Sequence, residues 1–325
     1  MTGQSPHRKP SRQGVLAAAA KVAEIVPETP LLPLEIAGRT VWCKAECLQP
    51  IGAFKLRGAW HRLTDIDADD WGAGVVAFSS GNHAQGVAWA ARRLGIEATI
   101  VMPSDAPAKK LAATRALGAS VVLYDRMTGS REEIAGALAA ERGAVLVPSF
   151  DDPWVIEGQG SVGIEIAAQM EALTGAAPDR IVIPCGGGGL SAGIALACPE
   201  ADIRIAEPEG WDDMARSLEA GEIVPVAPNP PFTSCDALQT LRVSPLTFGP
   251  LAAAGAKGVA VTEAEIAEAM RVAFGQLRLV VEPGGAVALA AVLAGKVPIA
   301  EHTVVVLSGG NVDPAAFARV LEGTR

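Results

Sequence analysis

One lysine in the sequence lies among residues that suit a buried catalytic amine. Lys55 belongs to the segment GAFKLRG (52–58), where two large apolar side chains flank it and small residues lie close by. Burial lowers the pKa of a lysine, and the neutral amine that results can act as a nucleophile or a base. The segment fits an ordinary helix lysine with an exposed amine equally well. The residues around Lys55 therefore allow a catalytic role without requiring one.

Four turns rich in glycine or serine stand at the ends of apolar runs. They are Ser79-Ser80-Gly81-Asn82-His83, Gly186-Gly187-Gly188-Gly189, Glu282-Pro283-Gly284-Gly285 and Ser308-Gly309-Gly310-Asn311. Such turns expose backbone N–H groups, and a helix that follows adds its positive end, so they suit an anion. The tetraglycine turn has neither a Walker lysine nor G-x-G-x-x-G spacing, and a single phosphate fits it best. The turn at 79–83 is as consistent with a plain strand-to-helix connection.

Short apolar runs alternate with helical segments along most of the chain. The runs cover 73–79, 97–102, 119–124, 144–147, 179–185, 202–207, 257–262 and 302–308. This alternation predicts an α/β fold with open, twisted, mostly parallel sheets and flanking helices. Ligands of such sheets bind at the carboxyl ends of the strands, where the turns above lie.

The same pattern predicts how the chain is organised. We expect a small unit over 67–151, inserted into a larger unit made of 1–66 and 152–325. Thr262 and Glu265 fit a capping box, which predicts the start of a helix. Residues 222–250 are rich in proline and lack periodicity, so a long ordered loop is expected there. The Ala-rich stretch from Gly284 to Val297 is too short for a membrane span and predicts a buried helix.

Composition excludes several classes of protein. The chain has 325 residues, of which 50% are apolar and 19% charged, and its net charge of −9 argues against a nucleic-acid partner. No basic cluster suggests a membrane surface as a partner. The five cysteines form no C-x-x-C pair, so neither a disulfide framework nor a zinc site is expected. Buried thiols in the reducing cytoplasm are the simpler interpretation.

Taken together, the motifs resemble the fold-type II pyridoxal-phosphate enzymes, in the threonine/serine dehydratase and serine racemase family. The resemblance runs along nearly the whole chain, through ETPL (28–31), QPIGAFK (49–55), SSGNHAQG (79–86), FDDPWVIEGQG (150–160), PCGGGGL (184–190) and LSGGNVD (307–313). It implies a tryptophan synthase β-like fold, pyridoxal 5'-phosphate as cofactor and a small amino acid as substrate. It also implies a cytoplasmic homodimer, which agrees with the prevalence of two-fold symmetry among soluble oligomers.

The resemblance implies a role for each residue that matches a motif. The cofactor residues would be Lys55 as the Schiff-base lysine, Phe54 beside the ring, Asn82 at the ring hydroxyl, Gly186 to Gly189 around the phosphate, and Ser308 facing the pyridine nitrogen. Residues Ser79, Ser80, Gly81, Asn82 and His83 match the loop that receives the substrate carboxylate. A hydroxyl opposite the pyridine nitrogen leaves the ring mostly neutral, which favours prompt loss of a β-substituent. The implied reaction is removal of water and then ammonia from a β-hydroxy amino acid.

Three positions bear on which substrate is used. Ser80 matches a serine of racemase-like members, where it faces the lysine across the ring and permits racemisation; a bystander hydroxyl is an equal alternative. Arg131 matches an arginine that reaches the pocket and would suit the second carboxylate of 3-hydroxyaspartate, although a solvent-facing arginine is the commoner case. Ala237 replaces the glycine of the racemase motif and adds bulk, which puts strict serine racemase activity in doubt.

A metal site is a further implication of the resemblance. Glu207 and Asp213, with the carbonyl of Trp211, match cation ligands of racemase-like members, and oxygen ligands suit Mg²⁺ or Ca²⁺. Acidic residues at 212–213 also fit the start of a helix. We expect a threonine/serine dehydratase, with serine racemase and 3-hydroxyaspartate dehydratase as alternatives. A binding protein without turnover is disfavoured, since it needs no reactive amine at Lys55.

Overall fold

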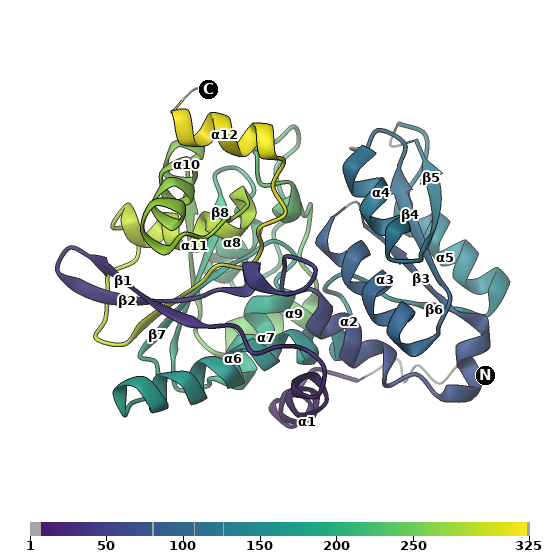
Figure 1. Cartoon of the computed structure of the whole chain (residues 1–325), viewed down its shortest axis with the longest axis horizontal. Coiled ribbons are helices and arrows are strands. Elements are labelled where there is room, and N and C mark those ends of the chain that lie inside the picture. The colour runs from purple at the N-terminus through teal and green to yellow at the C-terminus, as the bar shows by residue number, and fades with distance from the viewer. Residues whose placement is uncertain (1–7, 80, 107, 126, 324–325) are drawn as a thin grey trace.

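The computed structural model describes residues 8–79, 81–106, 108–125 and 127–323, which build two sheets with separate sets of helices (Figure 1). The larger sheet has six strands in the order β1-β2-β10-β7-β8-β9. Their bounds are β1 (Leu31–Ile36), β2 (Arg39–Lys44), β7 (Arg180–Pro184), β8 (Asp202–Pro208), β9 (Lys257–Val261) and β10 (Thr303–Val306). β1 pairs antiparallel with β2, and the other pairings are parallel.

The smaller sheet has four parallel strands in the order β5-β4-β3-β6. They are β3 (Val75–Phe78), β4 (Ala98–Pro103), β5 (Ser120–Tyr124) and β6 (Val145–Leu146). The predicted α/β class with two mostly parallel sheets is therefore confirmed. The division into 67–151 and the remainder stays a prediction.

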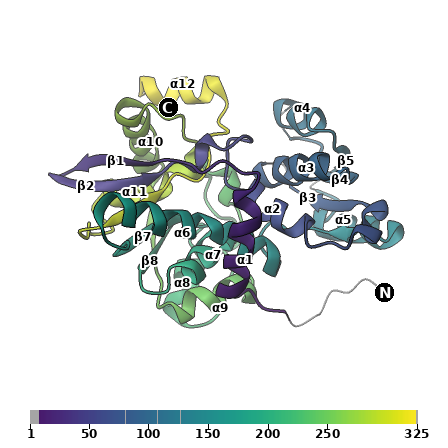
Figure 2. The same ribbon diagram turned by 60° about the horizontal axis from the view of Figure 1, so that its bottom comes forward.

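Helices cover both faces of each sheet. They are α1 (Arg12–Ala23), α2 (Leu56–Leu63), α3 (Asn82–Leu94), α4 (Ala108–Ala116), α5 (Arg131–Arg142), α6 (Pro153–Thr174), α7 (Gly189–Ala197), α8 (Asp213–Ala220), α9 (Pro245–Ala253), α10 (Glu263–Val272), α11 (Pro283–Leu293) and α12 (Pro314–Glu322). Figure 2 shows α6 and α7 on one side of the larger sheet and α10 and α12 on the other. Each face is closed by its own apolar cluster, and α11 is buried along most of its length. This confirms the buried helix expected from the Ala-rich stretch.

Local sequence signals account for most helix boundaries. The predicted capping box is present, because Thr262 accepts from the backbone of Glu265 and the Glu265 side chain accepts from the backbone of Thr262. The loop expected over 222–250 was only partly right, since α9 begins at Pro245. Ser244 and Thr247 form a second capping box there, and proline suits the first helical turn.

The remaining expectations concern membranes and thiols. Within the described residues, no helix is long and apolar enough to cross a membrane. All five cysteines are buried and free, as the absence of a pairing pattern predicted.

Candidate active site

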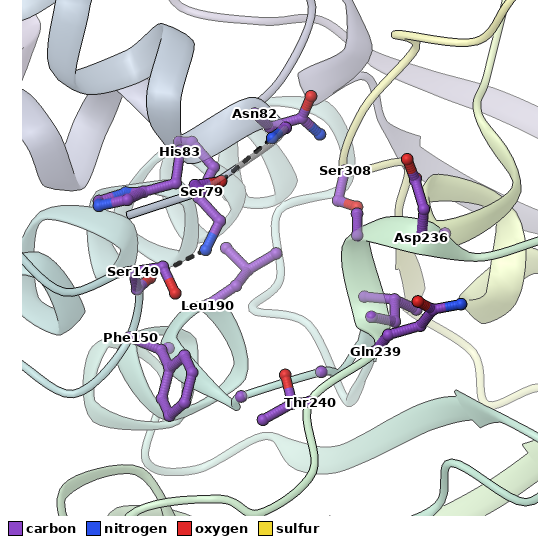
Figure 3. Close-up of a pocket in the computed structure, with 18 of the residues that line it drawn as sticks. Ser79, Asn82, His83, Ser149, Phe150, Leu190, Asp236, Gln239, Thr240 and Ser308 are labelled. Carbon is purple, nitrogen blue, oxygen red and sulfur yellow. Dashed lines mark hydrogen bonds between the residues drawn. The ribbon is translucent and has the colours of Figure 1, made fainter. Parts of the chain in front are cut away.

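Residues that follow strands of both sheets line one pocket, whose side chains Figure 3 shows. Ser79 follows β3 of the smaller sheet, whereas Gly186 and Ser308 follow β7 and β10 of the larger one. Three of the four predicted turns therefore place their first residues at carboxyl ends of strands, and Glu282 of the fourth lies on the same wall. The pocket encloses about 1060 Å³, including its open mouth.

Lys55 contributes its amine to this pocket from the N-terminal end of α2. Its Nζ donates a hydrogen bond to the backbone oxygen of Ser149 over 2.9 Å, and lies 5.0 Å from the ring centroid of Phe54. Desolvation by the surrounding protein lowers the pKa of this amine from 10.5 to about 8. Near pH 7 most of the Lys55 amine is still protonated, but its neutral fraction is far larger than that of an ordinary lysine, and the exposed-lysine alternative does not hold.

The tetraglycine turn wraps the opposite end of the pocket and leads into α7. A Cβ added at Gly187 would lie 2.2 Å from the ring of Phe150, and one at Gly188 would lie 2.7 Å from Met214. Gly188 also has φ +83°, a conformation that side chains rarely adopt. With the N-terminus of α7 behind it, this backbone forms a compact cradle suited to an anion.

Other polar groups line the same pocket. Asn82, the first residue of α3, is 8% exposed, and Ser308 is 6% exposed. His83 donates from Nε2 to the carbonyl of Val147 over 2.8 Å, since a carbonyl can only accept. Burial, and then the charge of Lys55, lowers the pKa of His83 to about 3, so its ring is neutral.

The predicted substrate loop is only partly described. Ser79 and Gly81 line the pocket, and the hydroxyl of Ser79 accepts from the N–H of Gly81 over 3.1 Å. Ser80 lies outside the described residues. Arg131 also lines the pocket, but its Nε pairs with Glu132 at 2.8 Å and its side chain is 42% exposed. The arginine is thus near the site without being fixed in it.

Sequence reasoning missed several residues of the pocket wall. Lys110 of α4 and Asp236 of the 3₁₀ turn η3 (Asp236–Leu238) form an ion pair across the pocket. Glu282 was noticed only as part of a turn, yet it is 5% exposed and lines the site. Burial is the main cause that raises its pKa from 4.5 to about 7. Its position before two glycines at a helix start was the available signal.

The proposed metal ligands lie away from this pocket. Glu207 and Asp213 are buried, and burial followed by the charge of Asp213 raises the pKa of Glu207 well above its ordinary value. Glu207 accepts from the backbone N–H of Ala215 at 2.8 Å, while Oδ1 of Asp213 is buried without a hydrogen-bond partner. The indole of Trp211 donates to the Pro231 carbonyl. Within the described chain, no group of three His, Cys, Asp or Glu side chains could hold a metal ion.

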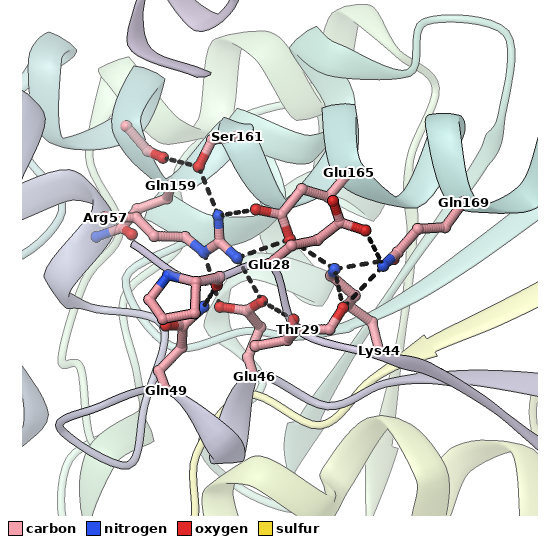
Figure 4. A network of polar contacts seen from close by, with 12 residues as sticks. Glu28, Thr29, Lys44, Glu46, Gln49, Arg57, Gln159, Ser161, Glu165 and Gln169 are labelled. Carbon is pink, nitrogen blue, oxygen red and sulfur yellow. Dashed lines mark hydrogen bonds and ion pairs between the residues drawn. The ribbon is translucent and has the colours of Figure 1, made fainter. Parts of the chain in front are cut away.

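A buried ionic network surrounds Arg57, which lies in the first turn of α2 (Figure 4). Arg57, two residues after Lys55, pairs with Glu46 at 2.8 Å and with Glu165 at 2.6 Å. Lys44 donates to Glu165 over 2.6 Å. The side chains of Arg57, Lys44 and Glu46 are fully buried, so each charge depends on its partners.

Comparisons with known proteins agree with this geometry. Residues 22–309 match the family model described as "Pyridoxal-phosphate dependent enzyme". The chain is 41% identical to an L-threo-3-hydroxyaspartate ammonia-lyase of Pseudomonas sp, over 96% of this chain and 99% of the relative. It is 34% identical to the serine racemase of Schizosaccharomyces pombe, over 96% and 97% of the two chains. The crystal structure of the threonine deaminase from T.th. superposes with a TM-score of 0.86 at 42% identity, covering 94% and 99% of the chains. The chain therefore belongs to the family of pyridoxal-phosphate-dependent enzymes.

Proposed function

We propose that this protein is an ammonia-lyase that removes water and then ammonia from a small β-hydroxy amino acid. The observation that carries the proposal is the lysine amine, with a pKa lowered to about 8, facing the same pocket as a glycine cradle. A base of that pKa can take a proton from carbon near neutral pH. The relatives named above include an ammonia-lyase and a threonine deaminase, which agrees with this assignment.

The residues present fit pyridoxal phosphate. The cradle from Gly186 to Gly189 would hold the phosphate, Phe54 and Asn82 would contact the ring and its hydroxyl, and Ser308 would face the pyridine nitrogen. When bound, the cofactor supplies an aldehyde for the substrate amine and an electron sink at the α-carbon. This division of labour leaves binding, orientation and proton transfer to the protein.

The protein's own part in the reaction follows from two groups. The loop that includes Ser79 and Gly81 would bind the α-carboxylate through the N–H groups at the start of α3, which follows it, and hold the α-carbon near Lys55. Nζ of Lys55 would take the α-proton, and the C–O bond at the β-carbon would break with its electron pair on oxygen. Return of that proton from the Lys55 ammonium would let the hydroxyl leave as water. Water lost in this step is regained on hydrolysis, so the net products are a 2-oxo acid and ammonia.

We further propose 3-hydroxyaspartate as the preferred substrate. Arg131 and Lys110 both line the pocket; each is paired with a carboxylate of the protein, and a second substrate carboxylate would exchange for those partners. The relative from Pseudomonas sp, which matches over almost its full length, is named for this substrate. Serine and threonine carry no second carboxylate to make this exchange.

A substrate panel on the cofactor-loaded protein tests both proposals. Ammonia release is expected to be fastest with L-threo-3-hydroxyaspartate, and slower with L-serine and L-threonine. Arg131→Ala is expected to raise KM for the dicarboxylate about tenfold or more, because a hydrogen bond to a charged group contributes about 1.5–3 kcal/mol. KM for L-serine is expected to change little.

Arg142→Ala is the matched control, since Arg142 lies on the same helix but bonds to Thr99 outside the pocket. A dicarboxylate KM that rises equally in both variants would contradict the role of Arg131. Interconversion of D- and L-serine without ammonia release would instead favour the racemase alternative, for which Ser80 is the candidate second proton donor.

We also propose that Glu207 and Asp213 bind Mg²⁺ or Ca²⁺, with the carbonyl of Trp211 and water completing the oxygen ligands. The unpartnered oxygen of Asp213 and the raised pKa of both carboxylates support cation binding at these residues. Addition of either ion at about a hundredfold excess over Kd is expected to stabilise the fold by about 2.7 kcal/mol, measured as a higher Tm. Asp213→Asn is expected to abolish the increase, and Asp212→Asn, one residue away, to retain it. An equal response in the two variants would rule the site out.

The assignments of a cytoplasmic location and a homodimer remain predictions. So does the boundary of the small unit at 67–151.

A further inference from the structure

The side-chain amide of Asn82 is held from two sides by residues of the larger sheet's loops. Its Oδ1 accepts a hydrogen bond from Nδ2 of Asn311 over 2.8 Å. Its Nδ2 donates to Oε1 of Glu282 over 2.6 Å. Asn82 begins α3, while Asn311 and Glu282 lie more than 190 residues later in the chain. These contacts therefore join the two halves of the pocket at one amide.

The direction of this chain of hydrogen bonds is fixed by a backbone carbonyl. Nδ2 of Asn311 also donates to the oxygen of Ile51 over 2.8 Å, and a carbonyl can only accept. The NH₂ group of Asn311 is therefore the donor to both oxygens, and the side-chain oxygen of Asn82 is an acceptor. The NH₂ group of Asn82 then turns to Glu282, which has to act as an acceptor. One N–H of Asn82 is used by this contact, and the other remains for a ligand in the pocket.

Close packing makes the contact with Glu282 specific. A Cβ added at Gly309 would lie 2.1 Å from Oε1 of Glu282, so only glycine allows the carboxylate to approach. The backbone N–H of Glu282 donates to the Gly309 oxygen over 3.0 Å, which fixes the residue at the start of α11. Gly309 of the SGGN turn is therefore needed to leave room for the Glu282 carboxylate as well as to form the turn.

Glu282 can change its charge within the physiological range. Burial raises its pKa to about 7, the hydrogen bond from Asn82 lowers it, Asp236 raises it and Lys110 lowers it. The thiol of Cys47 is close enough to feel the charge of Glu282, but burial raises its pKa to about 12 and it stays neutral. A carboxylate accepts a stronger hydrogen bond than the protonated acid does, so the ionised Glu282 holds the amide of Asn82 more firmly in its orientation.

We propose that Glu282 is a positioning residue that acts through Asn82 on the ring hydroxyl of pyridoxal phosphate, and that loss of its proton strengthens the hold of Asn82 on that hydroxyl. The inference rests on the proposed cofactor site and is independent of the substrate. On this proposal, the affinity for the cofactor depends on pH through the side chain of Glu282.

The test follows the visible absorption of the loaded protein and its affinity for added pyridoxal phosphate between pH 5.5 and 9. The wild-type protein is expected to show a transition near pH 7, which Glu282→Gln removes because glutamine accepts the same hydrogen bond without titrating. Affinity of the variant is expected to be about tenfold weaker above pH 8 and unchanged at pH 5.5.

Two neighbouring variants give shifts of opposite sign. Asp236→Asn removes a charge that raises the pKa of Glu282, so the transition is expected at lower pH; Lys110→Met removes a charge that lowers it, so the transition moves to higher pH. These two opposite shifts test the role of Glu282 even if Glu282→Gln fails to fold, and a transition that moves in neither variant would contradict it. If the transition depended only on the total negative charge of the pocket, Asp236→Asn would abolish it as Glu282→Gln does, and the inference would be wrong.

Unfolding of the cofactor-free protein provides a readout separate from the loaded enzyme. An acid whose pKa is raised by folding weakens the fold as pH rises from 4.5 through 7, so Glu282→Gln is expected to be more stable than wild type above pH 7. A transition that survives in Glu282→Gln with its midpoint unchanged overturns the inference alone. A protein that takes up no cofactor at any pH overturns the proposed function.

Discussion

Lys55→Ala is expected to slow ammonia release by at least about 10³-fold, because it removes both the attachment point of the cofactor and the base at the α-carbon. The fold is expected to persist, since the amine makes one hydrogen bond, to the Ser149 carbonyl. Rates measured with saturating pyridoxal phosphate separate loss of the base from loss of cofactor. A small primary amine added to the variant is expected to restore part of the rate by entering the space left by the side chain.

Removing the Lys55 amine, which is expected to lower activity, is expected to raise the stability of the cofactor-free protein. Folding lowers the pKa of Lys55 from 10.5 to about 8, so below pH 8 the folded state bears the cost of a charged amine in a desolvated site. Lys55→Met is therefore expected to raise the stability at pH 7, by an amount that declines between pH 8 and 10.5. Lys21→Ala, at an exposed lysine of α1, is the control for both measurements. An active Lys55→Ala protein without added amine would contradict the assignment.

The sequence was sufficient to predict the framework of the site. Parallel strands read as apolar runs because both faces of each sheet are covered by helices, and the turns after β7 and β10 were recognisable from their glycines. Those turns lie at strand ends, so predicting the strands also placed Gly186 and Ser308 at the carboxyl edge of a sheet; that β7 and β10 are neighbours came from the structure. The α9 helix was missed because the richness of 222–250 in proline outweighed the capping signal at Ser244.

Other parts of the site were beyond the reach of local patterns. Lys110 and Asp236 meet across 126 positions, and in the sequence each is an ordinary charged residue of a helix or loop. Glu282 and Asn82 are 200 positions apart, and the value of the carboxylate depends on burial that only the fold creates. Composition and periodicity describe one element at a time, whereas these pairs depend on how the elements are placed together.

The network around Arg57 is expected to produce the largest effect on stability. Arg57→Met leaves Glu46 fully buried without its cation and Glu165 with Lys44 alone. Removing one partner of a buried ion pair typically costs about 3–5 kcal/mol, because the remaining charge keeps its desolvation penalty. Urea unfolding at pH 7 measures this loss. Arg57→Lys is expected to recover only part of it, since an ammonium cannot form the paired hydrogen bonds of a guanidinium.

An exposed pair supplies the matched comparison. Arg271→Met breaks a contact with Glu268 in which both side chains are partly exposed, and a loss below about 1 kcal/mol is expected. A second variant, Arg57→Met with Glu165→Gln, returns the network to net neutrality and is expected to regain part of the stability. If Arg57→Met and Arg271→Met lost the same free energy of unfolding, burial of the ion pair would not be the cause of the larger effect expected at Arg57.

The pH dependence of this loss follows from Glu46. Burial alone would raise the pKa of Glu46, but Arg57 beside it holds the pKa below the ordinary value of 4.5. The stabilisation is therefore complete above pH 4.5 and disappears as the pH falls through the depressed value. The difference between wild type and Arg57→Met is expected to be constant near neutrality and to narrow in acid. Because Arg57 anchors the first turn of α2, which begins just after Lys55, the same variant links the stability of the network to the position of the catalytic amine.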